Sequence, residues 1–221
     1  MSINSYYFIK LLSDALPADA TVVVGTGTSF TCTYQAAKMK IGQRWLSAPG
    51  YSAMGYALPA SIGAVFATGK KVVCIVGDGD FQFNIQELAT IAHHKLPIII
   101  FVLNNGGYLT IKHMQDNHFG RRVGSDDGSG ISFPDLIPLS NAYDIHYSCL
   151  DDAQDVRLFL DRILDYTGPA ICEIAMPPDQ PLIPRVQSRK NSDGSVSSGD
   201  ISDMYPFLDR AEYEENMSVS K

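Results

Sequence analysis

Two short polar segments, Gly77–Asp80 and the pair Asn104 and Asn105, each follow an apolar run. A glycine-rich turn at the start of a helix presents backbone amides that favour an anion such as phosphate. A carboxylate in such a turn, here Asp78, repels phosphate unless a cation lies between them. Mg²⁺ binds carboxylate, amide and carbonyl oxygens together with phosphate oxygens. The two segments therefore predict a site for a phosphate-containing ligand and a hard cation.

The spacing of the two segments supports this prediction. Asn105 follows Asp78 by 27 positions, the length of one strand–helix–strand unit, and neighbouring parallel strands bring their carboxyl ends together. Asp78, the amide oxygen of Asn105 and a carbonyl near Gly107 would then fill an octahedron with phosphate oxygens and water. Each segment alone would be read as an ordinary turn, so the prediction depends on the pair.

The elements that must position these residues alternate between strands and helices. Continuous apolar runs, which suit strands buried on both faces of a parallel sheet, occupy Thr21–Val24, Lys71–Val76, Pro97–Leu103 and Pro169–Ile174. Shorter strands are expected at Arg44–Ser47 and Ile145–Ser148. Helical spacing marks Ile3–Leu16, Ala57–Ala67, Phe83–His93, Phe133–Ala142 and Asp151–Tyr166. We predict an α/β fold of three layers, with a mainly parallel six-stranded sheet and helices on both faces.

The composition changes near the carboxyl end of the chain. After Pro177 the pattern of strands and helices stops, and Gln187–Asp203 is polar and rich in serine. We therefore expect one domain over residues 1–180 and a C-terminal extension or lid over residues 181–221.

Charge and cysteine content exclude several functions. The 221 residues carry a net charge of −7, which argues against a nucleic-acid-binding surface. The four cysteines (Cys32, Cys74, Cys149 and Cys172) have neither a CxxC pair nor a zinc-site spacing, and indicate a reducing compartment such as the cytoplasm. No apolar stretch is long enough to span a bilayer, and the first residues do not resemble a signal peptide. No membrane partner is expected.

In combination these segments resemble the signature of thiamine diphosphate (ThDP) enzymes, in particular the C-terminal, pyrophosphate-binding domain of the acetolactate synthase group. The similarity covers about residues 4 to 185. It implies that Asp78, the side chain of Asn105 and the carbonyl of Gly107 bind Mg²⁺. The backbone amides implied to contact the diphosphate belong to Gly79, Asp80 and Phe81, and Gly77 is a further implied cofactor-binding residue.

Two further segments carry the resemblance. Ser47–Pro59 is similar to the family stretch that ends in Met-Gly-x-x-Leu-Pro. It implies that Met54 supports the bent cofactor, that the carbonyl of Ser52 accepts from the pyrimidine amino group, and that the Met54 amide serves the other pyrimidine edge. Without the resemblance Met54 would be read as core filler. The turn Gly25–Ser29 is where the family places diphosphate contacts, with Gly25, Thr28 and Ser29 as the candidates. Acetolactate synthases usually have Gln-His in place of Thr28 and Ser29; the hydroxyls can still bond phosphate, but this departure weakens the assignment to acetolactate synthase itself.

In the resembling family, a glutamate that bonds the pyrimidine ring deprotonates the cofactor indirectly. It belongs to a separate pyrimidine-binding domain, in the full-length chain or on a partner subunit. Glu87 follows the diphosphate turn and lies at the wrong end of the cofactor for this role. We therefore expect no catalytic residue in this chain, no activity from the chain alone, and a homodimer or tetramer as the assembly.

Three functions remain open at this point. The chain is part of an acetolactate synthase-like decarboxylase or carboligase (a transferase or lyase) acting on a 2-keto acid, or the small subunit of a split decarboxylase of the sulfopyruvate or phosphonopyruvate type, or a non-catalytic scaffold with the ThDP fold. The presence of Asp78, Asn105 and Met54 argues against the scaffold. The segment Ile183–Lys190 resembles the extended C-terminus of larger enzymes and favours the first function over the second.

Overall fold

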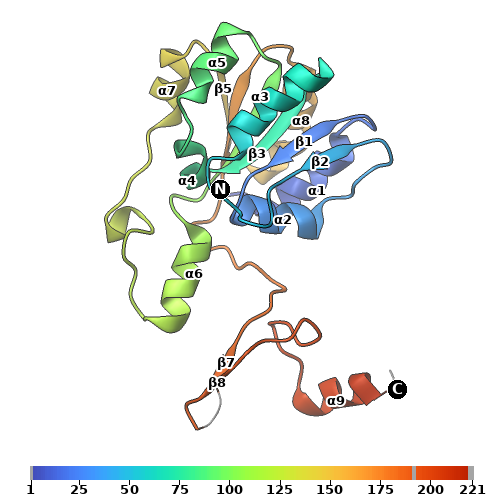
Figure 1. The fold of residues 1–221 in the computed structure, drawn as a ribbon, viewed down its shortest axis with the longest axis vertical. Helices are drawn as coiled ribbons and strands as arrows, with labels where there is room; N and C mark the ends of the chain where they lie inside the picture. The colour runs from blue at the N-terminus through green and yellow to red at the C-terminus, as the bar shows by residue number, and fades with distance from the viewer. Residues whose placement is uncertain (1, 191–192, 219–221) are drawn as a thin grey trace. The chain divides into compact units, whose positions relative to one another are not determined.

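A computed structural model describes residues 2–190 and 193–218. The chain forms two compact units, residues 1–180 and residues 181–221. The first contains a six-stranded sheet in the order β2-β1-β3-β4-β6-β5, in which every pair is parallel (Figure 1). Its strands are β1 (Thr21–Val24), β2 (Arg44–Leu46), β3 (Val72–Gly77), β4 (Ile98–Asn104), β5 (His146–Leu150) and β6 (Ala170–Ala175). The predicted fold class is confirmed.

Helices cover both faces of this sheet (Figure 1). One face carries α3 (Ala57–Thr68), α5 (Glu87–His93) and α7 (Leu136–Ala142), whose apolar side chains share one core with the sheet. The other carries α1 (Ser5–Ala15), α2 (Thr28–Ala36) and α8 (Val156–Asp165). Two helices begin where strands β3 and β4 end: α4 (Asp78–Gln82) and α6 (Leu109–His118). The three layers thus leave the carboxyl ends of the central strands open to a ligand.

The central strands are apolar without interruption because they are buried on both faces. Cys74 and Ile100 belong to the core shared with α3, α5 and α7. Phe101, the next residue of β4, points the other way and meets Phe8 of α1, with ring centroids 5.4 Å apart. All three strand residues are fully buried. Because successive side chains of a strand point to opposite faces, one apolar run contributes to the cores on both sides of the sheet.

The ends of several elements differ from the sequence-based expectation. β3, β4 and β6 each extend one residue further than expected at the carboxyl end. The helix expected over Phe83–His93 begins only at Glu87, because residues 83–86 form turns. The helix expected over Asp151–Tyr166 is a 3₁₀ turn, Ala153–Asp155, followed by α8. The helix expected over Phe133–Ala142 begins after Asp135, whose carboxylate accepts from the Ile137 amide.

Two helices beside the site were not expected at all. α2 has the sequence TSFTCTYQA, rich in hydroxyl and aromatic residues of modest helix propensity. It begins after Gly27, whose φ of +66° is a left-handed conformation that favours glycine. α6 has only a weakly apolar face. Tertiary packing at the end of a strand, rather than local propensity, places both helices.

The second unit has little regular structure. A two-stranded antiparallel ribbon pairs β7 (Arg189–Lys190) with β8 (Val196–Ser197), and α9 (Arg210–Ser218) follows. Arg185 and Tyr205 exchange two backbone hydrogen bonds, and the Arg185 guanidinium lies 5.7 Å from the Tyr205 ring centroid. Residues 191 and 192 of the polar segment Gln187–Asp203 lie outside the described residues. The role of residues 181–221 as a lid stays a prediction.

Within the described residues, no helix is long and apolar enough to cross a membrane.

Candidate diphosphate and metal site

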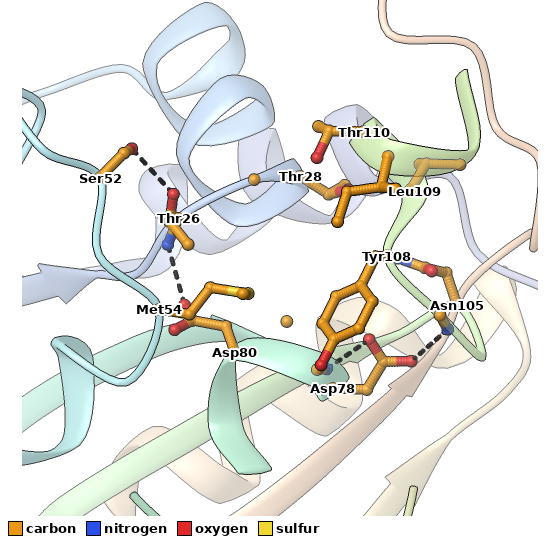
Figure 2. Close-up of a pocket in the computed structure, with 15 residues that line it drawn as sticks. Thr26, Thr28, Ser52, Met54, Asp78, Asp80, Asn105, Tyr108, Leu109 and Thr110 are labelled. Atoms are coloured by element: carbon orange, nitrogen blue, oxygen red, sulfur yellow. Dashed lines mark hydrogen bonds between the residues drawn. The ribbon is translucent and has the colours of Figure 1, made fainter. Parts of the chain in front are cut away.

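A pocket of about 230 Å³ opens where four neighbouring strands end (Figure 2). Its walls are the segments that follow β2, β1, β3 and β4, which are consecutive in the sheet. The chain runs outward from β1 to β2 and then crosses to β3 on the other side of β1. Such a reversal is where open α/β sheets bind ligands. Nine residues predicted from the sequence line it: Thr28, Ser52, Met54, Gly77, Asp78, Gly79, Asp80, Asn105 and Gly107.

Asp78 is the first residue of α4 and is buried. Its Oδ1 accepts a hydrogen bond from the Gly79 amide (2.8 Å), and its Oδ2 accepts one from the Gly107 amide (3.0 Å). The second bond ties the loop after β4 to the end of β3. Burial raises the pKa of Asp78 to about 6, although the backbone hydrogen bonds oppose that rise. Each carboxylate oxygen keeps a lone pair for a cation.

Within the described part of the chain, Asn105 has a buried side-chain oxygen without a hydrogen-bond partner, which indicates a ligand site. It is 4% exposed, and its Oδ1 has no hydrogen-bond partner among the described residues. Leaving a buried oxygen unsatisfied costs about 1–3 kcal/mol, so such an atom calls for an explanation. Both Asn105 and Asp78 line the pocket (Figure 2). A cation between them would satisfy the amide oxygen and neutralise the buried carboxylate.

Asp80, the second carboxylate of the turn, binds protein amides. Its Oδ2 accepts from Thr26 (2.8 Å) and its Oδ1 accepts from Gly55 (2.6 Å). One side chain thus joins the loops after β1 and β2 to the end of β3. Gly25 makes this approach possible, because a Cβ there would lie 2.0 Å from Asp80 Oδ2. Burial raises the pKa of Asp80, against these two amide bonds.

The loop after β2 brings Ser52 and Met54 to the pocket. Ser52 has a φ of +51°, a conformation that costs about 1 kcal/mol or more outside glycine, and its hydroxyl accepts from Thr26 Oγ1 (2.8 Å). Met54 is 37% exposed rather than buried in the core. Figure 2 shows its thioether extending into the pocket from the Asp80 side toward Tyr108. Met54 is therefore available to a ligand.

Three predicted residues do not line the pocket. Gly25 donates its amide to the Ile75 carbonyl within the sheet. Ser29 is fully buried and its hydroxyl donates to the Thr26 carbonyl. Phe81 packs in the core below the turn. The side chains of these residues shape the loops around the pocket, and the amide of Phe81 remains at the first turn of α4.

Other residues of the pocket wall were missed from the sequence: Thr26, Gly27, Tyr108, Leu109, Thr110 and Ile111. The ring of Tyr108 lies so close to Gly79 that a Cβ on the glycine would be 2.2 Å from Tyr108 Cε1. Lys112 was also missed; it is 1% exposed, its ammonium donates to the Pro178 carbonyl, and its charge lowers the pKa of Asp78. For Tyr108 to Lys112 the position just after the asparagine pair was the available signal, and for Thr26 and Gly27 it was the turn Gly25–Ser29 that contains them.

Residues 25–174 match a protein-family model described as the C-terminal TPP binding domain of thiamine pyrophosphate enzymes, TPP being another name for ThDP. The chain belongs to this family. The chain is 29% identical over 209 residues to acetolactate synthase 2, chloroplastic, of Zea mays, covering 92% of the chain and 33% of that protein. It is 32% identical over 185 residues to the acetolactate synthase large subunit of Pyropia yezoensis, covering 83% and 31%.

The chain thus spans about a third of the length of the curated relatives it matches. Within that third, the donor set of this TPP-binding domain fits a diphosphate-bound hard cation. Among the described residues, no three His, Cys, Asp or Glu side chains form a group that could hold a metal. The oxygen donors that line the pocket include the Asp78 carboxylate, the Asn105 amide oxygen and backbone carbonyls, and these are ligand types that Mg²⁺ prefers.

The contact between Gly25 and Asp80 predicts a stability difference between two glycine substitutions. Gly25→Ala places a methyl group against the Asp80 carboxylate and should lower the free energy of unfolding by about 1–3 kcal/mol. Gly63→Ala, on α3 with open space around its Cβ, should raise it by up to about 1 kcal/mol. Urea unfolding of both variants measures this. A Gly25→Ala protein as stable as the wild type would contradict the contact.

The raised pKa of Asp78 predicts a pH effect on the metal-free protein. Since this carboxyl has a folded pKa of about 6 against an ordinary 3.8, its charge destabilises the fold above pH 6 and the penalty fades as the pH falls through 6. With a chelator present, the stability advantage of Asp78→Asn over wild type should be roughly 1 kcal/mol larger near pH 7.5 than near pH 5. Urea unfolding at both pH values tests this. An advantage that is constant or larger in acid would refute the burial penalty.

Proposed function

We propose that this chain binds ThDP through Mg²⁺ and forms the diphosphate-binding half of an acetolactate synthase-like active site for a 2-keto acid. The observation that carries this proposal is the buried Asp78 carboxylate beside an unsatisfied amide oxygen of Asn105, at the ends of adjoining strands. Membership of the TPP-binding family supports the cofactor, and the acetolactate synthase relatives support the reaction class.

In this proposal Asp78, the Asn105 side chain and the Gly107 carbonyl hold the cation. The amides at the start of α4, from Gly79 to Phe81, and the Thr28 hydroxyl contact the diphosphate. Gly25 and Ser29 support the turn that presents Thr28. Met54 supports the bend of the cofactor, and the Ser52 carbonyl and Met54 amide meet its pyrimidine ring. When bound, ThDP supplies a thiazolium ring that accepts the electrons released when a 2-keto acid loses carbon dioxide.

We assign the acid–base group for this chemistry to another domain. None of the residues that line the pocket is a glutamate, and Glu87 begins α5, away from the pocket wall. A pyrimidine-binding domain, in the same protein or on a partner subunit, would supply the glutamate and complete the site in a homodimer or tetramer. All four cysteines are free thiols, which agrees with a proposed cytoplasmic location.

The metal assignment predicts the loss of Mg²⁺-dependent cofactor binding when either side-chain ligand is removed. Calorimetry should show that wild type binds ThDP in Mg²⁺ and not in excess chelator. Asp78→Ala and Asn105→Ala should each weaken binding by about 100-fold or more, because each removes a direct ligand. Asp19→Ala, which removes an exposed carboxylate paired with Lys70, serves as the control. An unchanged affinity of Asp78→Ala for ThDP in Mg²⁺ would contradict the metal assignment.

The missing glutamate predicts that the pure chain releases no carbon dioxide from pyruvate, even with ThDP and Mg²⁺ present. Adding a protein that carries the pyrimidine-binding domain should restore turnover on the enzyme's own 2-keto acid. Carbon dioxide release from a panel of 2-keto acids measures both. Turnover by the pure chain would show that the proton chemistry does not need a second domain.

A split 2-keto acid decarboxylase is the second candidate. Thr28 and Ser29 stand where the resembling acetolactate synthases usually carry Gln-His, and Thr28 lines the pocket. This departure favours a reaction that differs from acetolactate synthesis. Both reactions release carbon dioxide, so the organic product formed from the same substrates separates the two candidates: a carboligase joins the intermediate to a second carbonyl, whereas a decarboxylase releases it as an aldehyde.

A further inference from the structure

A chain of hydrogen bonds lies behind the loop that carries Asn105. It begins at Tyr147 on the edge strand β5, passes through Glu173 on β6 and ends at Asn104, the last residue of β4. None of these residues lines the pocket. All three side chains lie on the sheet face that carries α3, α5 and α7. Tyr147 packs against the core on that face, and so do the residues two positions before Glu173 and Asn104, which point to the same side of their strands.

Asn104 uses both ends of its amide. Its Nδ2 donates to Glu173 Oε1 (2.6 Å), and its Oδ1 accepts from the Gly106 amide (3.0 Å). The second bond closes a short turn over Asn105. Gly106, within that turn, has a φ of +68°, a left-handed conformation suited to glycine. Since the next amide in the chain, from Gly107, donates to Asp78, the Asn104 side chain sets the path by which the loop reaches the metal site.

Glu173 holds Asn104 in this orientation. Its other oxygen, Oε2, accepts from the Tyr147 hydroxyl (2.5 Å). Within the described residues Glu173 makes no ion pair, so its carboxylate depends on two neutral donors. Hydrogen bonds to a charged acceptor are stronger than those between neutral groups. The amide of Asn104 is therefore anchored by its nitrogen end, which leaves its oxygen for Gly106.

We propose that Glu173 is a positioning residue for the metal site: through Asn104 it fixes the turn that directs Asn105 Oδ1 and the Gly107 backbone at the cation. Tyr147 supports Glu173 in turn. This inference rests on the proposed metal site. Partners behind metal ligands commonly change metal affinity by about 10- to 100-fold when they are removed, so the role is measurable without catalysis.

Binding of Mn²⁺, a paramagnetic substitute for Mg²⁺, provides the test. Mn²⁺ is titrated into the full-length protein at saturating ThDP, and free Mn²⁺ is measured by electron paramagnetic resonance. Glu173→Ala should raise the Mn²⁺ Kd by about 10- to 100-fold. Glu173→Gln should stay within about threefold of wild type, because its amide oxygen can still accept from Asn104, and Tyr147→Phe should also cause a rise of only about threefold. Ser148→Ala, which removes a neighbouring hydrogen bond to His146, should leave the Kd unchanged.

A second pair of variants keeps the test valid if Glu173→Ala does not fold. Asn104→Asp preserves the side-chain shape and the acceptor for Gly106 but removes the donor to Glu173, so the Mn²⁺ Kd should rise about tenfold. Adding Glu173→Gln to this variant restores a donor–acceptor pair and should return the Kd toward wild type. A Kd for Asn104→Asp at or below the wild-type value, or no recovery in the double variant, would overturn the proposal.

The outcomes separate this proposal from the function it rests on. If wild type has no ThDP-dependent Mn²⁺ site, both fail together. If wild type binds, Asp78→Ala does not, and Glu173→Ala binds like wild type, only the positioning role is wrong. If Glu173→Ala lowers the melting temperature and leaves the Mn²⁺ Kd unchanged, Glu173 is structural and the proposal is likewise overturned.

Discussion

The Gly107 amide donates a hydrogen bond to the Asp78 carboxylate, and this contact joins the ends of two neighbouring parallel strands. It exists because β3 and β4 pair in register, with Gly77 opposite Leu103, so that the residues following each strand emerge side by side. The backbone on both sides is glycine-rich, which lets the carboxylate approach the amide closely. Asn105 is then held beside Asp78 in the pocket wall, with an oxygen that the protein leaves unsatisfied.

The site buries negative charge before any ligand arrives. Asp78 and Asp80 are both buried, and burial raises the pKa of each. Asp80 accepts hydrogen bonds from two amides of other loops, and Asp78 accepts them from Gly79 and Gly107. In both cases these bonds only partly offset the effect of burial on the pKa. The unsatisfied Asn105 oxygen and the buried Asp78 carboxylate in one pocket wall support the proposal that a cation binds between them. In that proposal the cation offsets the repulsion between the anionic diphosphate and a protein with a net charge of −7.

Much of this arrangement was predictable from the sequence because strand ends and glycine turns leave clear patterns. The uninterrupted apolar runs located β1, β3, β4 and β6, and hence the carboxyl end of the sheet, where Asp78 and Asn105 line one pocket. Contacts that depend on three-dimensional packing were not predictable. Asp80 was expected to contribute only its backbone amide, yet its side chain joins loops that follow β1 and β2. Tyr108, whose ring lies over Gly79, directly precedes α6, and the buried Lys112 lies within it; the weak apolar pattern of this segment concealed the helix.

The cation position is the central claim, and a crystal structure of the protein with ThDP and Mn²⁺ tests it most directly. Anomalous scattering locates the metal independently of the surrounding model. The account predicts one strong peak roughly 2.0–2.3 Å from an Asp78 carboxylate oxygen, from Asn105 Oδ1 and from the Gly107 carbonyl. Bound ThDP with no peak between Asp78 and Asn105, or with the metal on other residues, would contradict it.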